Sequence, residues 1–126
     1  MSAGPGARTA DLKTAVRHAL SLLGRGQTQL AREQAEEILR QYPGEANSLF
    51  VVAAALRAEG RGAQALERLQ ALIRRAPDFA LAGQELGFAL ADAGDSLGAI
   101  EALQKAVAIE PKLPGSWKLL GELHSA

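Results

Sequence analysis

The side chains that could catalyse a reaction or bind a metal ion are few in this chain and poorly placed to act together. Its 126 residues include two histidines, His18 and His124, and no cysteine. Histidine is the usual general acid or base near neutral pH, but these two lie close to opposite ends of the sequence. We interpret each as a packing residue or a partner in a local hydrogen bond. The lack of cysteine excludes a disulfide framework, a thiolate zinc site and a thiol nucleophile.

The remaining candidates for chemistry also have simpler interpretations. Glu33, Glu67 and Glu101 recur at one constant interval, and carboxylates share a proton only at short distance. A repeat of that length is expected to hold them apart as a structural ladder on successive helices. Gly24-Arg25-Gly26 and Gly60-Arg61-Gly62 lack the Lys-Ser/Thr pair that follows a phosphate-binding loop, so we predict turns. The sequence therefore predicts no catalytic residue, cofactor or metal site, and a chain that is not itself an enzyme.

The spacing that separates these glutamates recurs through most of the chain. It therefore indicates the helices and turns that position the side chains. Prolines, glycines, alanines and leucines all recur on it. The repeating sets are Pro43, Pro77 and Pro111; Gly26, Gly60 and Gly94; Ala31, Ala65 and Ala99; Leu22, Leu56 and Leu90; and the small residues Ala19, Ala53, Gly87 and Gly121. A short motif repeated at a fixed period predicts a solenoid, in which each repeat buries its apolar face against its neighbours.

Residues 80–113 show what one repeat contains. A first helix is expected to end at Gly94, because glycine readily adopts the left-handed conformation of a helix C-terminus. Asp95 can then cap the next helix through its side-chain oxygen, and Pro111 ends that helix. Gly87 and Ala99 are small, which predicts that the two helices approach closely there. One repeat is therefore expected to consist of a helix, a tight turn and a second helix that ends before a proline.

This pattern resembles the tetratricopeptide repeat over residues 12–126. The residues that match the family motif in the third repeat are Leu86, Gly87, Leu90, Ala99, Leu103, Ala106 and Pro111. The residues that depart from it are His18, Ala35, Ile38, Leu72 and Gly83. The resemblance implies an all-α fold, a right-handed α-solenoid of helix-turn-helix repeats with three full units and a C-terminal helix.

The expected domain organisation follows from this register. Residues 1–8 are predicted to be a disordered lead-in and residues 9–126 a single repeat domain, with repeats at 12–45, 46–79 and 80–113 and a partial repeat or capping helix at 114–126. Seven helices are predicted, near residues 9–24, 27–41, 45–59, 62–75, 79–93, 96–109 and 114–125. Gly60 and Gly94 should lie in turns between helices.

The resemblance implies a scaffold that binds a protein or peptide in a concave groove lined by the first helix of each repeat. The predicted groove residues are Lys13, Val16, Leu20, Asn47, Phe50, Ala54, Arg57, Leu81, Gln84, Phe88 and Lys118. Most are apolar, and contiguous exposed apolar surface marks interaction sites. We therefore expect an apolar or amphipathic segment as the partner, with Phe50 and Phe88 as anchors. Some of these side chains could instead pack between helices, and for Leu20 and Leu81 this alternative is equally favoured.

Relatives that bind a terminal carboxylate hold it with a clamp of Lys, Asn and Arg. The matching positions here are Val16, Leu20, Val51, Leu81 and Glu85, which include no basic residue and no asparagine. We therefore reject that activity.

Two alternatives to the scaffold remain open. The chain could be the N-terminal docking or oligomerisation region of a larger enzyme, since arrays of this Ala-, Leu- and Arg-rich bacterial style resemble those fused to sulfotransferases. It could also bind RNA, but its net charge is zero and nucleic-acid binders are usually basic. We predict a protein or peptide partner, no nucleic acid and no membrane contact, and a cytoplasmic location.

The C-terminal helix is expected to leave apolar surface uncovered. Trp117, Leu120 and His124 are assigned to the face that packs on the third repeat, and Leu119 and Leu123 to the uncovered side. End repeats normally need a polar outer face. The sequence therefore predicts either a homo-oligomer formed through this helix or a fragment of a longer protein whose following residues cover it.

Overall fold

The computed structural model describes residues 5–125, and within this range it is built from seven helices with no strand. The helices are α1 (Pro5–Gly24), α2 (Thr28–Gln41), α3 (Ala46–Ala58), α4 (Gly62–Arg75), α5 (Ala80–Asp92), α6 (Ser96–Ile109) and α7 (Pro114–Ser125). The prediction of an all-α helical-repeat fold is therefore confirmed.

The start of α1 differs from the sequence prediction. The helix begins at Pro5, so residues 5–8 are helical where a disordered lead-in was expected, and residues 1–4 lie outside the described part of the chain. Proline suits the first turn of a helix because its missing N–H would have had no intrahelical partner there.

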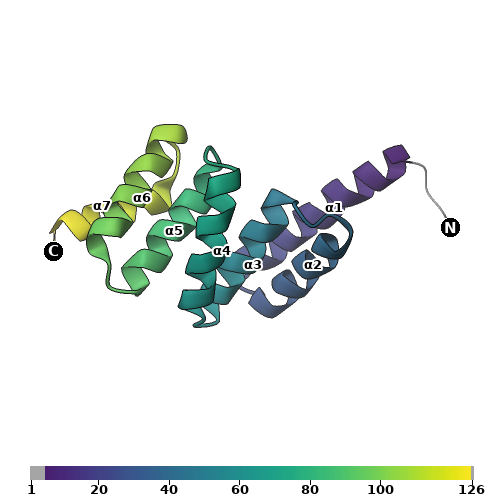
Figure 1. Ribbon diagram of the computed structural model, residues 1–126, viewed down its shortest axis with the longest axis horizontal. Coiled ribbons are helices and arrows are strands. Elements are labelled where there is room, and N and C mark those ends of the chain that lie inside the picture. The colour runs from purple at the N-terminus through teal and green to yellow at the C-terminus, as the bar shows by residue number, and fades with distance from the viewer. Residues whose placement is uncertain (1–4, 126) are drawn as a thin grey trace. The chain divides into compact units, whose positions relative to one another are not determined.

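The helices form two compact units, the first ending at Glu59 and the second beginning at Gly60. In the first unit α2 packs against α1 and α3, and α1 also contacts α3. In the second unit α5 packs against α4 and α6, and α7 contacts both α5 and α6 (Figure 1). The boundary between the units falls between the two helices of the predicted repeat 46–79.

Glycine ends the first helix of each hairpin. Gly26, Gly60 and Gly94 have φ values of 78°, 83° and 86°, the left-handed region that residues with a Cβ rarely adopt. After α5, the N–H of Gly94 donates to the Ala91 carbonyl and that of Asp95 to the Leu90 carbonyl, which is the Schellman arrangement. The predicted turns at Gly60 and Gly94 are confirmed.

Side-chain carboxylates cap two of the following helices. Asp95 Oδ1 accepts a hydrogen bond of 2.9 Å from the Gly98 N–H, as the sequence predicts for α6. Glu45 caps α3, where its Oε1 accepts from the Ser48 N–H at 2.7 Å and its Oε2 from the Asn47 N–H at 3.2 Å. The Glu45 cap was not predicted, because glutamate is not among the preferred N-cap residues.

The close contact between α5 and α6 depends on Gly87. A Cβ at this position would lie 2.5 Å from Leu103 Cδ2 and 3.4 Å from the Ala99 carbonyl oxygen. Leu103 and Ala99 are both fully buried. The structure therefore confirms the prediction that Gly87 and Ala99 let these two helices approach.

We expect Gly87→Ala to destabilise the protein by about 1–3 kcal/mol, because the added methyl group overlaps the side chain of a fully buried leucine, which must shift within the core. Gly121→Ala is the matched control, since Gly121 is the same residue one repeat later and a Cβ there meets no atom within 4 Å. In the control, alanine should stabilise α7 by up to about 1 kcal/mol. Chemical denaturation followed by circular dichroism compares the two, and equal effects would contradict this account of the α5–α6 contact.

Candidate functional site

In the first unit, the predicted groove residues divide into exposed and buried sets. On α1, Lys13 is exposed while Val16 and Leu20 are half-buried; on α3, Asn47 and Arg57 are half-buried. Phe50 and Ala54, by contrast, are buried, and Phe50 is only 8% exposed. The interpretation of Phe50 as a groove anchor is therefore wrong. Every residue from Phe50 to Leu56 is buried, so these side chains offer no exposed ligand-binding face.

In the second unit, the predicted groove residues lie on two helices in contact, α5 and α7. We call Leu81, Gln84, Phe88 and Lys118 the α5/α7 face. Leu81 is 39% exposed, Lys118 is exposed, and Gln84 and Phe88 are half-buried. These four residues therefore lie on two helices in contact, and Leu81 is the exposed apolar side chain among them.

Two residues of the α5/α7 face also hold α7 in place. The Ser116 hydroxyl, fully buried on α7, donates a hydrogen bond of 2.8 Å to Gln84 Oε1 on α5. A Cβ added to Gly115 would lie 3.2 Å from both Gln84 Oε1 and Phe88 Cζ. Gln84 and Phe88 therefore support the first turn of α7, and Leu81 is the apolar side chain most available to a partner.

The positions that match the carboxylate clamp have no exposed cationic group. Val51 and Glu85 are buried, and Val16 and Leu20 are half-buried apolar side chains. An ammonium or guanidinium group aimed at the ligand is what binds a carboxylate most strongly.

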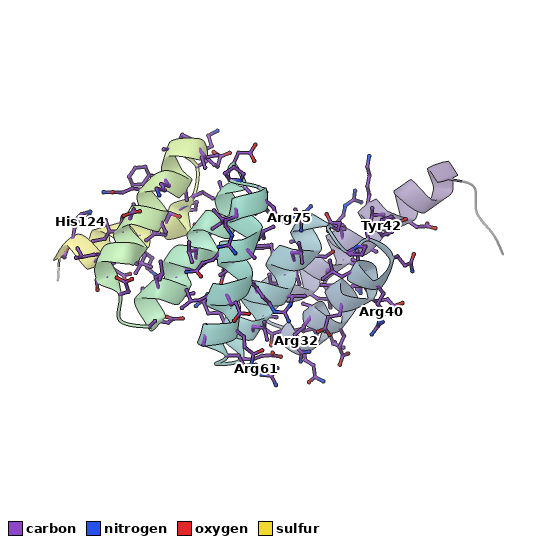
Figure 2. The ribbon with its side chains drawn as sticks, viewed as in Figure 1. Arg32, Arg40, Tyr42, Arg61, Arg75 and His124 are labelled. Carbon is purple, nitrogen blue, oxygen red and sulfur yellow. The ribbon has the colours of Figure 1, made fainter. Side chains whose placement is uncertain are left out.

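Both histidines are exposed, which corrects the interpretation of them as packing residues. His18 lies on α1, where it lines a shallow cleft with Leu22 and Leu30, and His124 lies near the end of α7 (Figure 2). No described helix covers either side chain. Across residues 5–125 no group of three His, Cys, Asp or Glu side chains is placed to hold a metal ion.

Trp117 also differs from its predicted place. It is 55% exposed, whereas Leu119 and Leu123, expected to be uncovered, are half-buried. The indole Nε1 donates a hydrogen bond of 2.8 Å to the Pro111 carbonyl. This bond holds the ring beside the loop before α7, away from the interior. Leu120 is buried, as predicted.

A bidentate ion pair in the first unit was not predicted from the sequence. Arg32 on α2 binds Glu59, at the end of α3, with Nε–Oε1 and Nη2–Oε2 distances of 3.1 and 3.3 Å, and its Nη1 lies 3.5 Å from Glu36 Oε1. The hydrogen bond to Glu59 raises the pKa of Arg32 against the opposing effect of burial. Both side chains are about 20% exposed (Figure 2 labels Arg32). Because Leu66 and Ile100 stand at the equivalent positions, the repeat pattern gave no signal for this pair.

No helix in the described part of the chain is both long enough and apolar enough to cross a membrane. Taken together, the fold and the α5/α7 face define a helical-repeat protein with exposed apolar and charged side chains.

Comparison with known proteins agrees with this class. The family model described as tetratricopeptide repeat matches residues 14–44. The TPR repeat-containing protein PA0015 of Pseudomonas aeruginosa is 39% identical over 61 residues, which are 48% of this chain and 58% of that protein. The chain therefore spans little more than half the length of this curated relative.

Solved structures show the same fold. MamA from Desulfovibrio magneticus, residues 41 to the end, superposes with a TM-score of 0.72 at 25% identity, covering 90% of this chain and 64% of that one. The first TPR domain of Spaghetti (RPAP3), solved with the HSP90 peptide SRMEEVD, gives a TM-score of 0.77 at 12% identity and covers 90% of both chains. Residues 14–44 thus match the tetratricopeptide-repeat family, and the chain has the fold of solved tetratricopeptide-repeat domains.

We expect the Arg32–Glu59 pair to stabilise the first unit by about 1 kcal/mol, because a bidentate, partly buried ion pair exceeds an exposed one. A double-mutant cycle of Arg32→Met and Glu59→Gln, measured by denaturant unfolding at pH 7, gives this coupling free energy directly. The matched control is the exposed Lys105–Glu101 pair, 3.2 Å apart on α6, whose coupling should stay below about 0.5 kcal/mol. A coupling no larger than that of the control would show that Arg32 is not a structural residue.

Proposed function

We propose that this protein is a non-enzymatic interaction scaffold that binds an apolar or amphipathic segment of a protein partner. The observation that carries the proposal is the α5/α7 face, where the exposed side chain of Leu81 lies on the same helix as the half-buried ring of Phe88. Leucine exposed on a helix whose other apolar residues are largely covered offers area that a partner can remove from water, at roughly 25 cal/mol per Å².

The repeat fold supports this proposal. The Spaghetti domain, similar in fold, was solved with a peptide bound, which shows that an array of this size can bind one. The present chain has no basic or amide side chain at the clamp positions. We therefore propose that its ligand is recognised through apolar side chains along the segment rather than through a terminal carboxylate, with Lys118 favouring an acidic residue nearby.

The other functions open from the sequence remain predictions. A docking region of a larger enzyme, such as a sulfotransferase fusion, would be recognised from the length of the parent gene, and RNA binding from a salt-dependent affinity. The cytoplasmic location also stays a prediction. Self-association through the C-terminal helix also remains a prediction. The exposed apolar side chain on this helix is Trp117, not Leu119 or Leu123.

We expect Leu81→Asp to weaken peptide binding at least tenfold, because a buried carboxylate without a partner opposes an apolar contact. Short peptides are selected from a random phage library against the full chain, and their dissociation constants are then measured by fluorescence anisotropy. Selected sequences should be amphipathic, with large apolar residues at a regular spacing.

The matched control is Leu97→Asp, which makes the same change at a leucine that is 82% exposed on α6. Its affinity for the selected peptides should equal that of the wild type. If Leu81→Asp binds as tightly as the wild type, or if both variants lose binding equally, the α5/α7 face is not the peptide site.

A further inference from the structure

A second apolar surface lies in the second unit, between α6 and α7. This α6/α7 groove is open to solvent and has a volume of about 580 Å³. Its lining residues are Gln104, Val107 and Ala108 of α6 and Trp117, Leu120, Gly121 and His124 of α7. The groove is mostly apolar, and it includes the most exposed aromatic side chain that the structure describes, Trp117. No described helix packs over it.

The repeat shows what shape this groove fits. A shift of one repeat places α6 on α4 and α7 on α5, so that Gln104 and Val107 correspond to Gln70 and Ile73, and Leu120 to Leu86. These earlier residues face α6 itself, because they line one cavity together with its residues Ala102, Ala106 and Ile109. The α6/α7 groove therefore repeats much of the surface on which α6 packs, with Trp117 and His124 in place of Gly83 and Leu90.

The equivalent glycines of α5 and α7 show how a helix would be aligned in the α6/α7 groove. On α5, the space beside Gly87 is filled by Leu103 of α6, since a Cβ there would lie 2.5 Å from the leucine side chain. Gly121 is the equivalent residue on α7, and a Cβ there would meet no atom within 4 Å. The site that receives a leucine in the third repeat is thus formed again one repeat later, and it is open.

We propose that the α6/α7 groove binds an amphipathic α-helix from a partner protein, with an apolar face of the α6 type. In α6 this face consists of Ala99, Leu103 and Ala106, all fully buried. The partner's leucine lies over Gly121, as Leu103 lies over Gly87.

The next contact along the groove calls for a small residue in the partner. In the third repeat, Ala106 packs against Gly83, where an added Cβ would lie 3.4 Å from the alanine Cβ. Trp117 stands at the position equivalent to Gly83. Because the indole is far larger than the hydrogen of glycine, the partner needs alanine or glycine at the place of Ala106.

A second copy of this chain would have to give up one of its own interhelical contacts to fill the groove with such a face. The helices of this chain that carry such a face already bury it internally: Ala31, Ala35 and Ile38 on α2, Ala65, Leu69 and Leu72 on α4, and Ala99, Leu103 and Ala106 on α6. A second copy could offer one of them only by unfolding its own hairpin. The groove is also separate from the α5/α7 face, so this inference does not rest on the proposed function.

The test uses a synthetic peptide with the α6 sequence, residues 96–109, acetylated and amidated at its ends. Trp117 is the only tryptophan, and covering it with the peptide should move its fluorescence emission to shorter wavelength as peptide is added to the full chain. The control peptide carries Leu103→Lys and should leave the emission unchanged, because a lysine cannot fill the space beside Gly121 without burying its charge.

Variants of the protein then locate the binding site. Gly121→Leu fills the groove from within and should weaken peptide binding at least tenfold, while the chain keeps its helical circular dichroism because the position is open. Leu81→Asp should bind the α6 peptide as tightly as the wild type does, which separates this proposal from that for the α5/α7 face.

Three results would overturn the proposal. The first is an emission spectrum that does not respond to the α6 peptide. The second is undiminished binding by Gly121→Leu, which would mean that the peptide replaces α6 in its own site. The third is a wild-type dimer in sedimentation that Gly121→Leu dissociates, which would assign the groove to a second copy.

Discussion

The second unit is organised by the absence of a side chain at residue 87. Leu103 occupies the space that a Cβ of Gly87 would need, and this lets α6 approach α5 closely enough to bury Ala99, Ala102, Leu103 and Ala106. An alanine-rich face contributes little apolar area per residue. It becomes a stable core only at short interhelical distance, where many weak dispersion contacts are made at once. The hairpin turn at Gly94 and the cap at Asp95 serve this contact by reversing the chain within a few residues.

The sequence predicted best those features whose physical cause is local. A glycine with positive φ, a carboxylate within reach of a helix N-terminus and a proline after a helix each act over a few residues, so Gly26, Gly94 and Asp95 could be interpreted without knowing the fold. Because the repeat interval is constant, the interpretation of one helical hairpin could then be applied to the others. The Glu45 cap and the helical start at Pro5 were missed because each depends on the geometry of its own turn, for which the repeat offers no second example.

Burial of individual side chains was predicted less well, because it depends on residues distant in sequence. Phe50 occupies a groove position of the family, yet the surrounding residues of α3 are so completely packed that its ring is buried. Trp117 occupies a packing position, yet its bond to the Pro111 carbonyl holds the ring at the surface. Arg32 on α2 finds Glu59 at the far end of the next helix. A repeat position thus predicts where a backbone lies more reliably than what its side chain contacts.

The two candidate surfaces differ in how far the chain itself defines their ligands. On the α5/α7 face, no equivalent contact elsewhere in the chain shows what Leu81 and Lys118 bind. For this face, only the chemical class of the partner can therefore be proposed. The α6/α7 groove has such a counterpart, because α4 and α5 present an equivalent surface with α6 upon it. In a repeat protein, the helix that packs on a surface inside the array indicates what an equivalent exposed surface can bind. The apolar face of α6 is therefore the most specific description of a ligand that this chain contains.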